Sequence, residues 1–416
     1  MIELLCETFG IDARVRAAAT LAHEQTRALT YPAQARVKAH VLRAFFDEGV
    51  YESDLAGTSG YGYDDAARER YEALLARVLG AEQVLARLSI VSGTQAIVTA
   101  LGACVPPGGR LIAAAGPPYD TLRNAICDAD YSLVSQGVIY QEIALRDDGA
   151  PDLEAIAAAA AQGDASVVFV QRSRGYAPRP SLDVDTCAQI IACVKRAAPH
   201  VAVLVDNCYG ELVEDREPTH AGADLIMGSL IKNLGGALAP GGGYIAGRAD
   251  LIQRVAARLY APGLRGGIGP TFGFGRAMIQ GLFIAPMIVE QTLRGLDFAA
   301  ALFAQLGFDV DPQPGSVRTD IVQAIRLGDP KRLLRFTAGL QTAMPLNARF
   351  RPEPGAVPGY VDPVVMSSGA FVGGATIELS CDAPLRAPFE VYLQGGIVAE
   401  HAMLGALLAA AAVTAE

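Results

Sequence analysis

The sequence predicts an α/β fold in which a mostly parallel sheet is covered by helices and followed by a smaller α+β domain. Three patterns indicate this fold class. The N-terminal part shows helical periodicity only. From Val84, apolar runs of strand length alternate with amphipathic runs of helix length, which is typical of a parallel sheet with helices on both faces. From about Phe308, shorter runs of both kinds predict a second unit.

Length and composition agree with this division. The chain has 416 residues, of which 51% are hydrophobic and 19% charged, so it can bury more than one core. We predict an N-terminal helical arm over residues 1–55, a large domain over 56–285 and a small C-terminal domain over 286–416. The net charge of −10 gives no electrostatic footprint for nucleic acid or an anionic membrane as a partner.

Cysteine usage and the apolar stretches bear on the compartment. The seven cysteines include no C-x-x-C pair, which argues against a disulfide framework or a metal site and favours a reducing cytoplasm. No basic segment followed by an apolar one opens the chain, so we expect no signal peptide. The apolar stretches at 273–306 and 404–413 are better explained as buried helices than as membrane spans, because the first contains charges and the second is too short.

The N-terminal arm is expected to consist of helices. Residues 33–46 place apolar side chains at three- and four-residue spacing, as a helix with one buried face requires. The glycine-rich piece Gly57–Tyr63 ends this pattern, and Asp64 or Asp65 can cap the next helix. This piece is either a surface turn or an arm that brings its tyrosines to an active site.

Strands and helices are then expected in chain order. In the large domain we predict strands over 85–93, 110–116, 166–171, 201–206, 223–228 and 241–247, with helices over 94–105, 117–127 and 183–198. The run 273–306 predicts one or two buried helices with a kink or break at Pro286. In the small domain we predict strands over 317–327, 364–372 and 375–381, with helices over 331–344 and 395–413.

The residues that carry chemistry begin with Asp206 and Lys232. Asp206 ends one apolar strand, and Lys232 follows the next. If these strands are neighbours in a parallel sheet, their ends bring a carboxylate and an amine together. Pyridoxal 5′-phosphate (PLP) requires such a pair, because a lysine forms the Schiff base and an acid keeps the pyridinium nitrogen protonated. A helix N-cap at Asp206 and a lysine reaching from a loop to solvent are the structural alternatives.

The segment after Lys232 bears on the pKa of the lysine amine. It reads NLGGALAPGGGY and contains no other charged residue. Because burial disfavours the ammonium form, we expect the pKa of Lys232 to be lowered, which suits Schiff-base chemistry.

A phosphate site is predicted earlier in the chain. Ser92, Gly93 and Thr94 lie between a strand and a helix N-terminus, where free backbone N–H groups and the helix dipole favour an anion. The turn matches neither the P-loop nor the dinucleotide-binding pattern, and an ordinary N-cap is its alternative. Ser229 is placed to reach the same phosphate. Tyr119, after the following strand, can stack on a flat ring or simply anchor a helix start.

The chain also carries the segments SGTQAI, GPPYDTL, SRGYAPRPSL, VDNCYGELVE, GADLIMGSLIKN, GGYIAGRADL and VYLQGG. Together they resemble the methionine γ-lyase-like, aluminium-resistance branch of the cystathionine lyase superfamily. The resemblance extends from about Ala33 to Gly396. It implies the fold-type-I architecture of PLP-dependent transferase-like enzymes, with a mostly parallel sheet of the seven-stranded type and a smaller C-terminal domain.

This resemblance implies a role for each matching cofactor residue. Lys232 would bond covalently to PLP and act as the Cα base. Asp206 would pair with the pyridinium nitrogen, and Tyr119 would stack on the ring and take part in catalysis. The phosphate would be held by Ser92, Gly93, Thr94 and Ser229.

On the substrate side, the resemblance implies residues from two subunits. Tyr61 or Tyr63 would reach the neighbouring subunit's cofactor, with Tyr63 also near the substrate, in a homodimer or a dimer of dimers. Arg386 would bind the substrate carboxylate through its bidentate fork, with a surface arginine as the alternative. Gln95 stands where the family often has a histidine, and we count it as a substrate-side residue.

The predicted activity is a PLP-dependent β- or γ-elimination that cleaves a carbon–sulfur bond of an amino acid, through an external aldimine and a quinonoid. Replacement, aldol-type cleavage and amino transfer begin in the same way and stay open as alternatives. A non-catalytic PLP-binding protein is the alternative of another class. The presence of both Lys232 and Asp206 argues against it, because a scaffold needs neither.

Overall fold

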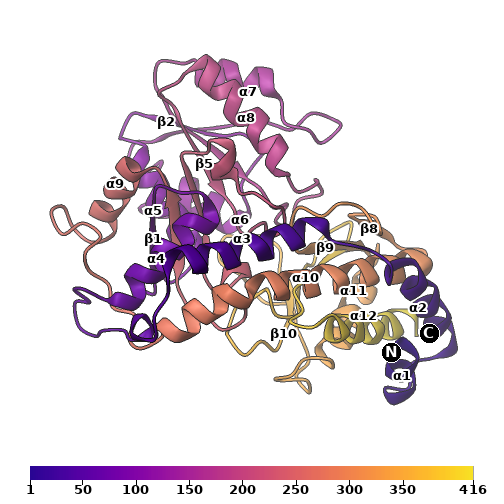
Figure 1. Cartoon of the computed structure of the whole chain (residues 1–416). Helices are drawn as coiled ribbons and strands as arrows, with labels where there is room; N and C mark the ends of the chain where they lie inside the picture. The colour runs from indigo at the N-terminus through magenta and orange to yellow at the C-terminus, as the bar shows by residue number, and fades with distance from the viewer. Residues whose placement is uncertain (416) are drawn as a thin grey trace.

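Two sheets form the centre of the molecule. The computed structural model describes residues 1–415. One sheet has seven strands in the order β1-β7-β6-β5-β4-β2-β3, and the other has five in the order β10-β11-β12-β9-β8. Figure 1 shows helices α3 (Pro32–Glu48) and α10 (Gly275–Gln305) side by side, with both chain ends near α12 (Ala399–Thr414).

The predicted N-terminal helices are confirmed. Besides α3, they are α1 (Ile2–Thr8), α2 (Ala13–Thr26) and α4 (Ala66–Leu79). Asp65 caps α4, since its Oδ1 accepts the N–H of Arg68 at 2.9 Å. The helix ends at Gly80, whose φ of +60° is the left-handed conformation that glycine adopts at low cost.

The larger sheet is mostly parallel, as predicted. Its strands are β1 (Gln83–Arg87), β2 (Arg110–Ala113), β3 (Ile139–Glu142), β4 (Ala165–Gln171), β5 (Ala202–Asp206), β6 (Leu225–Ser229) and β7 (Gly243–Gly247). Only the pairs that involve β7 are antiparallel. Along β5, Val203 and Val205 pack into one apolar core and Leu204 into the other, because successive side chains point to opposite faces.

Helices cover both faces of this sheet. They are α5 (Gly93–Cys104), α6 (Asp120–Arg123), α7 (Leu153–Ala160), α8 (Val184–Ala197) and α9 (Ala249–Leu259). In Figure 1, α7 and α8 lie together on one side, and α5 and α9 lie together on the other. The parallel strands are therefore buried on both faces, and their C-terminal ends are left free to form a site.

The C-terminal sheet is antiparallel throughout. Its strands are β8 (Asp309–Asp311), β9 (Val322–Arg326), β10 (Val364–Ser368), β11 (Ser380–Pro384) and β12 (Glu390–Gln394). Helix α11 (Pro330–Gln341) packs against α12 and this sheet. The smaller α+β unit is thus as expected from the sequence.

The run 273–306 forms one helix, α10, which continues through Pro286 without a break for 31 residues and packs against both α3 and α12. One local expectation was wrong, because the strand expected over 375–381 begins only at Ser380. Glu378 is used differently: its carboxylate accepts the N–H groups of Phe371 and Val372 at 2.9 and 3.0 Å and ties down a loop.

Two findings concern the chain as a whole. Within residues 1–415, no helix combines the length and the hydropathy that crossing a membrane requires. All seven cysteines are free thiols.

Candidate active site

The C-terminal ends of β5 and β6 bring Asp206 and Lys232 to one place. The two strands pair in parallel, with Asp206 opposite Met227, and the chain then turns after Ser229 to reach Lys232. This adjacency is the arrangement that the sequence predicted. Both side chains line a cavity of about 320 Å³.

Asp206 is a buried carboxylate with few partners of its own. Its Oδ1 accepts the N–H of Cys208 at 3.1 Å. Burial raises the pKa of Asp206, while the Lys232 amine and the Cys208 N–H oppose that rise. A ligand with a cationic N–H group could therefore form an ion pair with this carboxylate.

Lys232 has an aromatic neighbour. Its Nζ lies 3.7 Å from the ring centroid of Tyr209. Burial alone would lower the pKa of the amine, but Cys208, Tyr209 and Asp206 raise it above its ordinary value. The predicted lowering of this pKa was wrong, because the groups around the amine favour the ammonium more than burial disfavours it.

The predicted phosphate turn faces the same cavity. Ser92 is the N-cap of α5, and its Oγ accepts the N–H of Gln95 at 3.1 Å. A Cβ added to Gly93 would lie 3.3 Å from the Cys208 Sγ and 3.5 Å from Ser229, so this backbone passes close to the end of β6. Backbone N–H groups at the helix N-terminus and the hydroxyls of Ser92, Thr94 and Ser229 form a neutral anion cradle.

Tyr119 connects this cradle to the rest of the wall. Its hydroxyl lies 2.7 Å from the Oγ1 of Thr94. Its backbone N–H donates to the Oε1 of Gln171 at 2.8 Å, which fixes the start of α6 against the end of β4. Tyr119 is thereby held beside the anion cradle and lines the same cavity as Asp206, as a residue that stacks on a bound ring must do.

Loops of the C-terminal part of the chain, which carry Val357, Tyr360 and Gly374, complete the lining of the cavity. Besides the residues already described, the wall consists of Val91, Thr121, Ser173, Gly175, Tyr176, Ile231, Val357, Tyr360 and Gly374. The rings of Tyr176 and Tyr360 lie 5.3 Å apart. The hydroxyl of Thr121 donates to the carbonyl of Pro358 at 2.7 Å and so attaches the 357–360 loop to α6.

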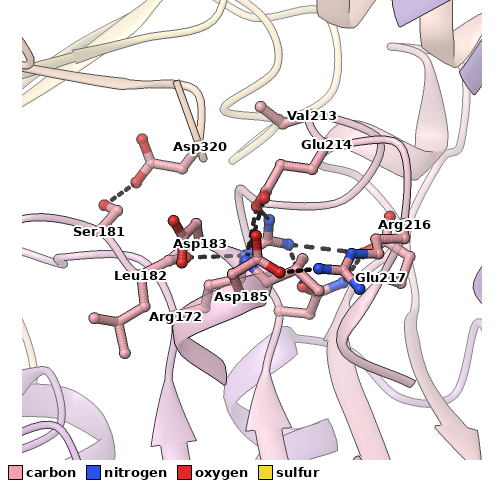
Figure 2. Close-up of polar contacts among 12 residues, drawn as sticks. Arg172, Ser181, Leu182, Asp183, Asp185, Val213, Glu214, Arg216, Glu217 and Asp320 are labelled. Atoms are coloured by element: carbon pink, nitrogen blue, oxygen red, sulfur yellow. Dashed lines mark hydrogen bonds and ion pairs between the residues drawn. The ribbon is translucent and has the colours of Figure 1, made fainter. Parts of the chain in front are cut away.

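A buried network supports the strand ends behind this wall (Figure 2). Arg172, next to β4, is fully buried and donates to the Oδ1 of Asn207 at 2.7 Å. The same guanidinium pairs with Glu214 and lies 3.7 Å from Glu217. Because Asn207 follows Asp206, these charges hold the end of β5 in position rather than acting on a ligand.

The residues present fit PLP. The cavity offers an anion cradle at a helix N-terminus, a buried carboxylate, an aromatic side chain and a lysine amine. Each of these matches one part of the cofactor, namely its phosphate, its ring nitrogen, its ring face and its aldehyde carbon.

Four residues predicted for the site do not line this cavity within one chain. The Oε1 of Gln95 accepts the N–H of Val91 at 2.8 Å, so this side chain completes its own turn. Tyr61 and Tyr63 lie on the surface, 77% and 59% exposed. Arg386 lies just behind Tyr176, where its Nη2 donates to the Tyr176 carbonyl at 3.4 Å. Their predicted roles stay predictions.

Sequence reasoning missed the aromatic residues near the lysine. Tyr209 follows Asp206 by three residues, and Tyr176 lies in the turn after β4. Both are in segments that carry the family resemblance, VDNCYGELVE and SRGYAPRPSL, which was the available signal. Tyr360 comes from the small domain, and its sequence context gives no such signal.

Comparison with known proteins agrees with this geometry. Residues 13–414 match the family model described as methionine gamma-lyase. The uncharacterized protein YnbB of Bacillus subtilis (strain 168) is 40% identical over 365 residues, which cover 87% of this chain and 86% of YnbB. The crystal structure of a carbon–sulfur lyase involved in aluminum resistance from Clostridium novyi NT has a TM-score of 0.92 at 38% identity, covering 98% of each chain.

A more distant structure shares the fold. The pyridoxal 5′-phosphate-dependent protein YhfS from Escherichia coli has a TM-score of 0.61 at 21% identity, covering 91% of this chain and 96% of YhfS. The predicted fold class is confirmed by these solved structures.

Proposed function

This chain belongs to the methionine gamma-lyase family, and on that premise we propose that it is a PLP-dependent carbon–sulfur lyase acting on an amino acid. PLP is its cofactor. The observation that carries the proposal is the convergence of the Asp206 carboxylate and the Lys232 amine on a cavity that also contains an anion cradle. A protein that merely packs or binds a partner has no need for this combination.

Each wall residue has a defined task. When bound, PLP supplies an electron sink for the negative charge that develops at the substrate Cα. Asp206 keeps a proton on the ring nitrogen by offering a buried negative charge. Lys232 would anchor the cofactor, and its Nζ, when free, would take the Cα proton. The cradle at the start of α5 would hold the phosphate, and Tyr119 would stack on the ring.

The small domain contributes the other wall. Val357 and Tyr360 line the cavity together with Lys232 and would limit the access of water to it. We propose that Arg386 receives the substrate carboxylate at this edge. Its Nη1 lies 3.7 Å from Asp120 and 3.5 Å from Asp362, which are long contacts that a bidentate carboxylate can replace.

The test is both spectroscopic and chemical. The purified protein is expected to be yellow, and borohydride should bleach the visible band while fixing PLP to Lys232, as peptide mass mapping would show. Incubation with cysteine-, homocysteine- and methionine-type amino acids should release a keto acid from at least one. A colourless protein after reconstitution with PLP would refute the cofactor assignment. A yellow protein that releases no keto acid from the whole panel would refute the lyase assignment alone.

We propose further that the working unit is a homodimer, alone or paired into a tetramer, whose sites are shared. Tyr61 and Tyr63 are exposed on a loop that buried groups hold firmly: Asp65 accepts the N–H groups of Thr58 and Thr271, both at 2.8 Å. Helices α3 and α10, which pack against each other, expose the apolar side chains of Phe46, Phe283 and Met287, and these offer a surface to a second copy. Other exposed apolar side chains in these segments are Leu42, Tyr51, Phe272 and Phe274.

Mixed dimers test the shared site. Lys232→Ala subunits and subunits carrying both Tyr61→Phe and Tyr63→Phe are each expected to be inactive or impaired. Refolded together, they should regain activity, because one of the two sites in a heterodimer receives an intact lysine and intact tyrosines. Keto acid release by the mixture is the measurement, and each variant mixed with itself is the control. If the tyrosine variant is impaired but the mixture does not recover, the tyrosines act within their own subunit.

The free thiols support a proposal about the compartment. Seven unpaired cysteines, five of them buried, suit a reducing cytoplasm, and we propose that location for the enzyme.

A further inference from the structure

Tyr209 stands out among the groups around the lysine because its ring lies against the amine. The Lys232 Nζ lies 3.7 Å from the ring centroid, well within the range of a cation–π contact. Both residues line the cavity, so the ring covers part of the amine at the wall of the space in which a substrate would lie.

The backbone of Tyr209 is strained. Its φ is +71°, a left-handed conformation that a bulky residue rarely adopts. A residue that only filled space could be a glycine or an asparagine here, at a lower conformational cost. Strain of this kind persists only where the surrounding structure enforces it, and it gathers at functional sites.

The surrounding structure does enforce it. The side-chain amide of Asn233, the residue directly after Lys232, donates to the Tyr209 carbonyl at 3.0 Å and to the Glu211 carbonyl at 2.8 Å. The N–H of Ile321 donates to the same Tyr209 carbonyl at 3.2 Å. The segment that carries the lysine thus fixes the turn that carries the ring, and the two are held in register.

Other titratable groups also face Lys232. Asp206 and Cys208 approach from β5 and the turn after it, Glu211 from the same turn, Tyr119 from the start of α6, and Asp382 from β11. Of these, Asp206, Cys208 and Tyr119 line the cavity, and in the described residues only Tyr209 presents an aromatic face to Nζ.

We propose that Tyr209 is a positioning residue whose ring face holds the Lys232 ammonium beside the Cα position after the lysine has taken the proton. This inference rests on the proposed function, since it assigns a partner to the lysine of that same site. The left-handed backbone of Tyr209 places the ring next to the amine, and the hydrogen bond from the Asn233 amide holds the backbone in this conformation.

Packing is the competing explanation. Tyr209 and Tyr176 also contact a small apolar cluster of Val322, Ala324 and Tyr392 in the smaller sheet. A packing role predicts that loss of the ring lowers thermal stability and leaves the chemistry of the lysine unchanged. A positioning role predicts a change in the pH dependence of the lysine itself.

Two variants separate these explanations. Tyr209→Phe keeps the ring, and Tyr209→Leu removes it while bearing the same left-handed backbone. The full-length protein is freed of PLP with a carbonyl scavenger, and the rate of covalent PLP capture is followed by visible absorbance across a pH series. Because only the free amine attacks, the midpoint of this profile reports the pKa of Lys232. We expect the Leu variant to shift the midpoint down by about one pH unit and the Phe variant to leave it in place.

Steady-state kinetics provide the second readout. The Leu variant is expected to lose kcat by about tenfold with KM little changed, and the Phe variant to keep most of its kcat. If the Leu profile matches the wild type, or if Phe shifts as far as Leu, the ring is not the partner of the amine and the inference is overturned. If Leu fails to fold by circular dichroism, Tyr209→Met is measured with the same criteria. Absence of PLP capture by the wild type at any pH would overturn the proposed function together with this inference.

Discussion

Replacing Lys232 with alanine is expected to reduce lyase turnover by at least about 10³-fold, the largest effect of any single substitution in this chain. The change removes both the covalent anchor for PLP and the base that takes the Cα proton. The remaining wall is intact, because Asp206, Tyr119 and the cradle at the start of α5 do not depend on the lysine for their positions. The variant should therefore still bind PLP, without fixing it on borohydride treatment.

Keto acid release and borohydride trapping check this result together. Lys331→Ala is a suitable control, since that lysine lies exposed in the first turn of α11, away from the cavity. It should match the wild type in both assays. A Lys232→Ala protein that retained turnover would remove the lysine from its assigned role, whatever the colour of the protein.

The proximity of Asp206 and Lys232 could be predicted from the sequence because it depends only on two strands being neighbours in the sheet. Two apolar runs that form neighbouring parallel strands bring the residues at their ends together, and the pairing of β5 with β6 is what the structure has. The anion cradle followed in the same way, from a strand, a Ser-Gly-Thr turn and a helix start. In each case, one local pattern determines the geometry.

The environment of the lysine could not be predicted, because it is assembled through space. The segment after Lys232 carries no charge, and this suggested a lowered amine pKa. In the folded protein, Asp206 comes from the preceding strand and Tyr209 from the turn after it, and both act on the amine from outside its own segment. The composition of the segment around Lys232 does not include these groups. The pKa of the amine was therefore predicted to fall, whereas it rises.

The substrate side was harder for a related reason. Tyr360 and Val357 reach the cavity only because the loop that carries them is attached to α6 through Thr121. Nothing in the periodicity of residues 350–363 indicates that contact. Gln95 was predicted to lie on the substrate side because it is a polar residue at the start of a helix next to the site. Its side chain instead accepts the N–H of Val91 in the preceding turn.

Replacing Asp206 with asparagine tests the electrostatic half of the site. The side chains have nearly the same size, and asparagine can still accept the Cys208 N–H through Oδ1. What is lost is the negative charge that keeps the ring nitrogen of PLP protonated. We expect kcat to fall by about 10²–10³-fold, comparable to the loss of one preorganised electrostatic contact in other enzymes, while PLP is still fixed by borohydride.

A matched buried carboxylate distinguishes this effect from general damage. Asp297 on α10 is buried, accepts from Tyr31 at 2.6 Å and from Arg318 at 2.7 Å, and does not line the cavity. Asp297→Asn should lower the midpoint of thermal unfolding, because Arg318 loses its buried partner, yet leave kcat nearly unchanged. The opposite pattern, with Asp206→Asn less stable but fully active, would make Asp206 a structural N–H acceptor and deprive the cavity of its acid. The two aspartates thus differ in a way that burial alone does not reveal: Asp297 pairs with the Arg318 guanidinium, whereas Asp206 lines the cavity beside Lys232.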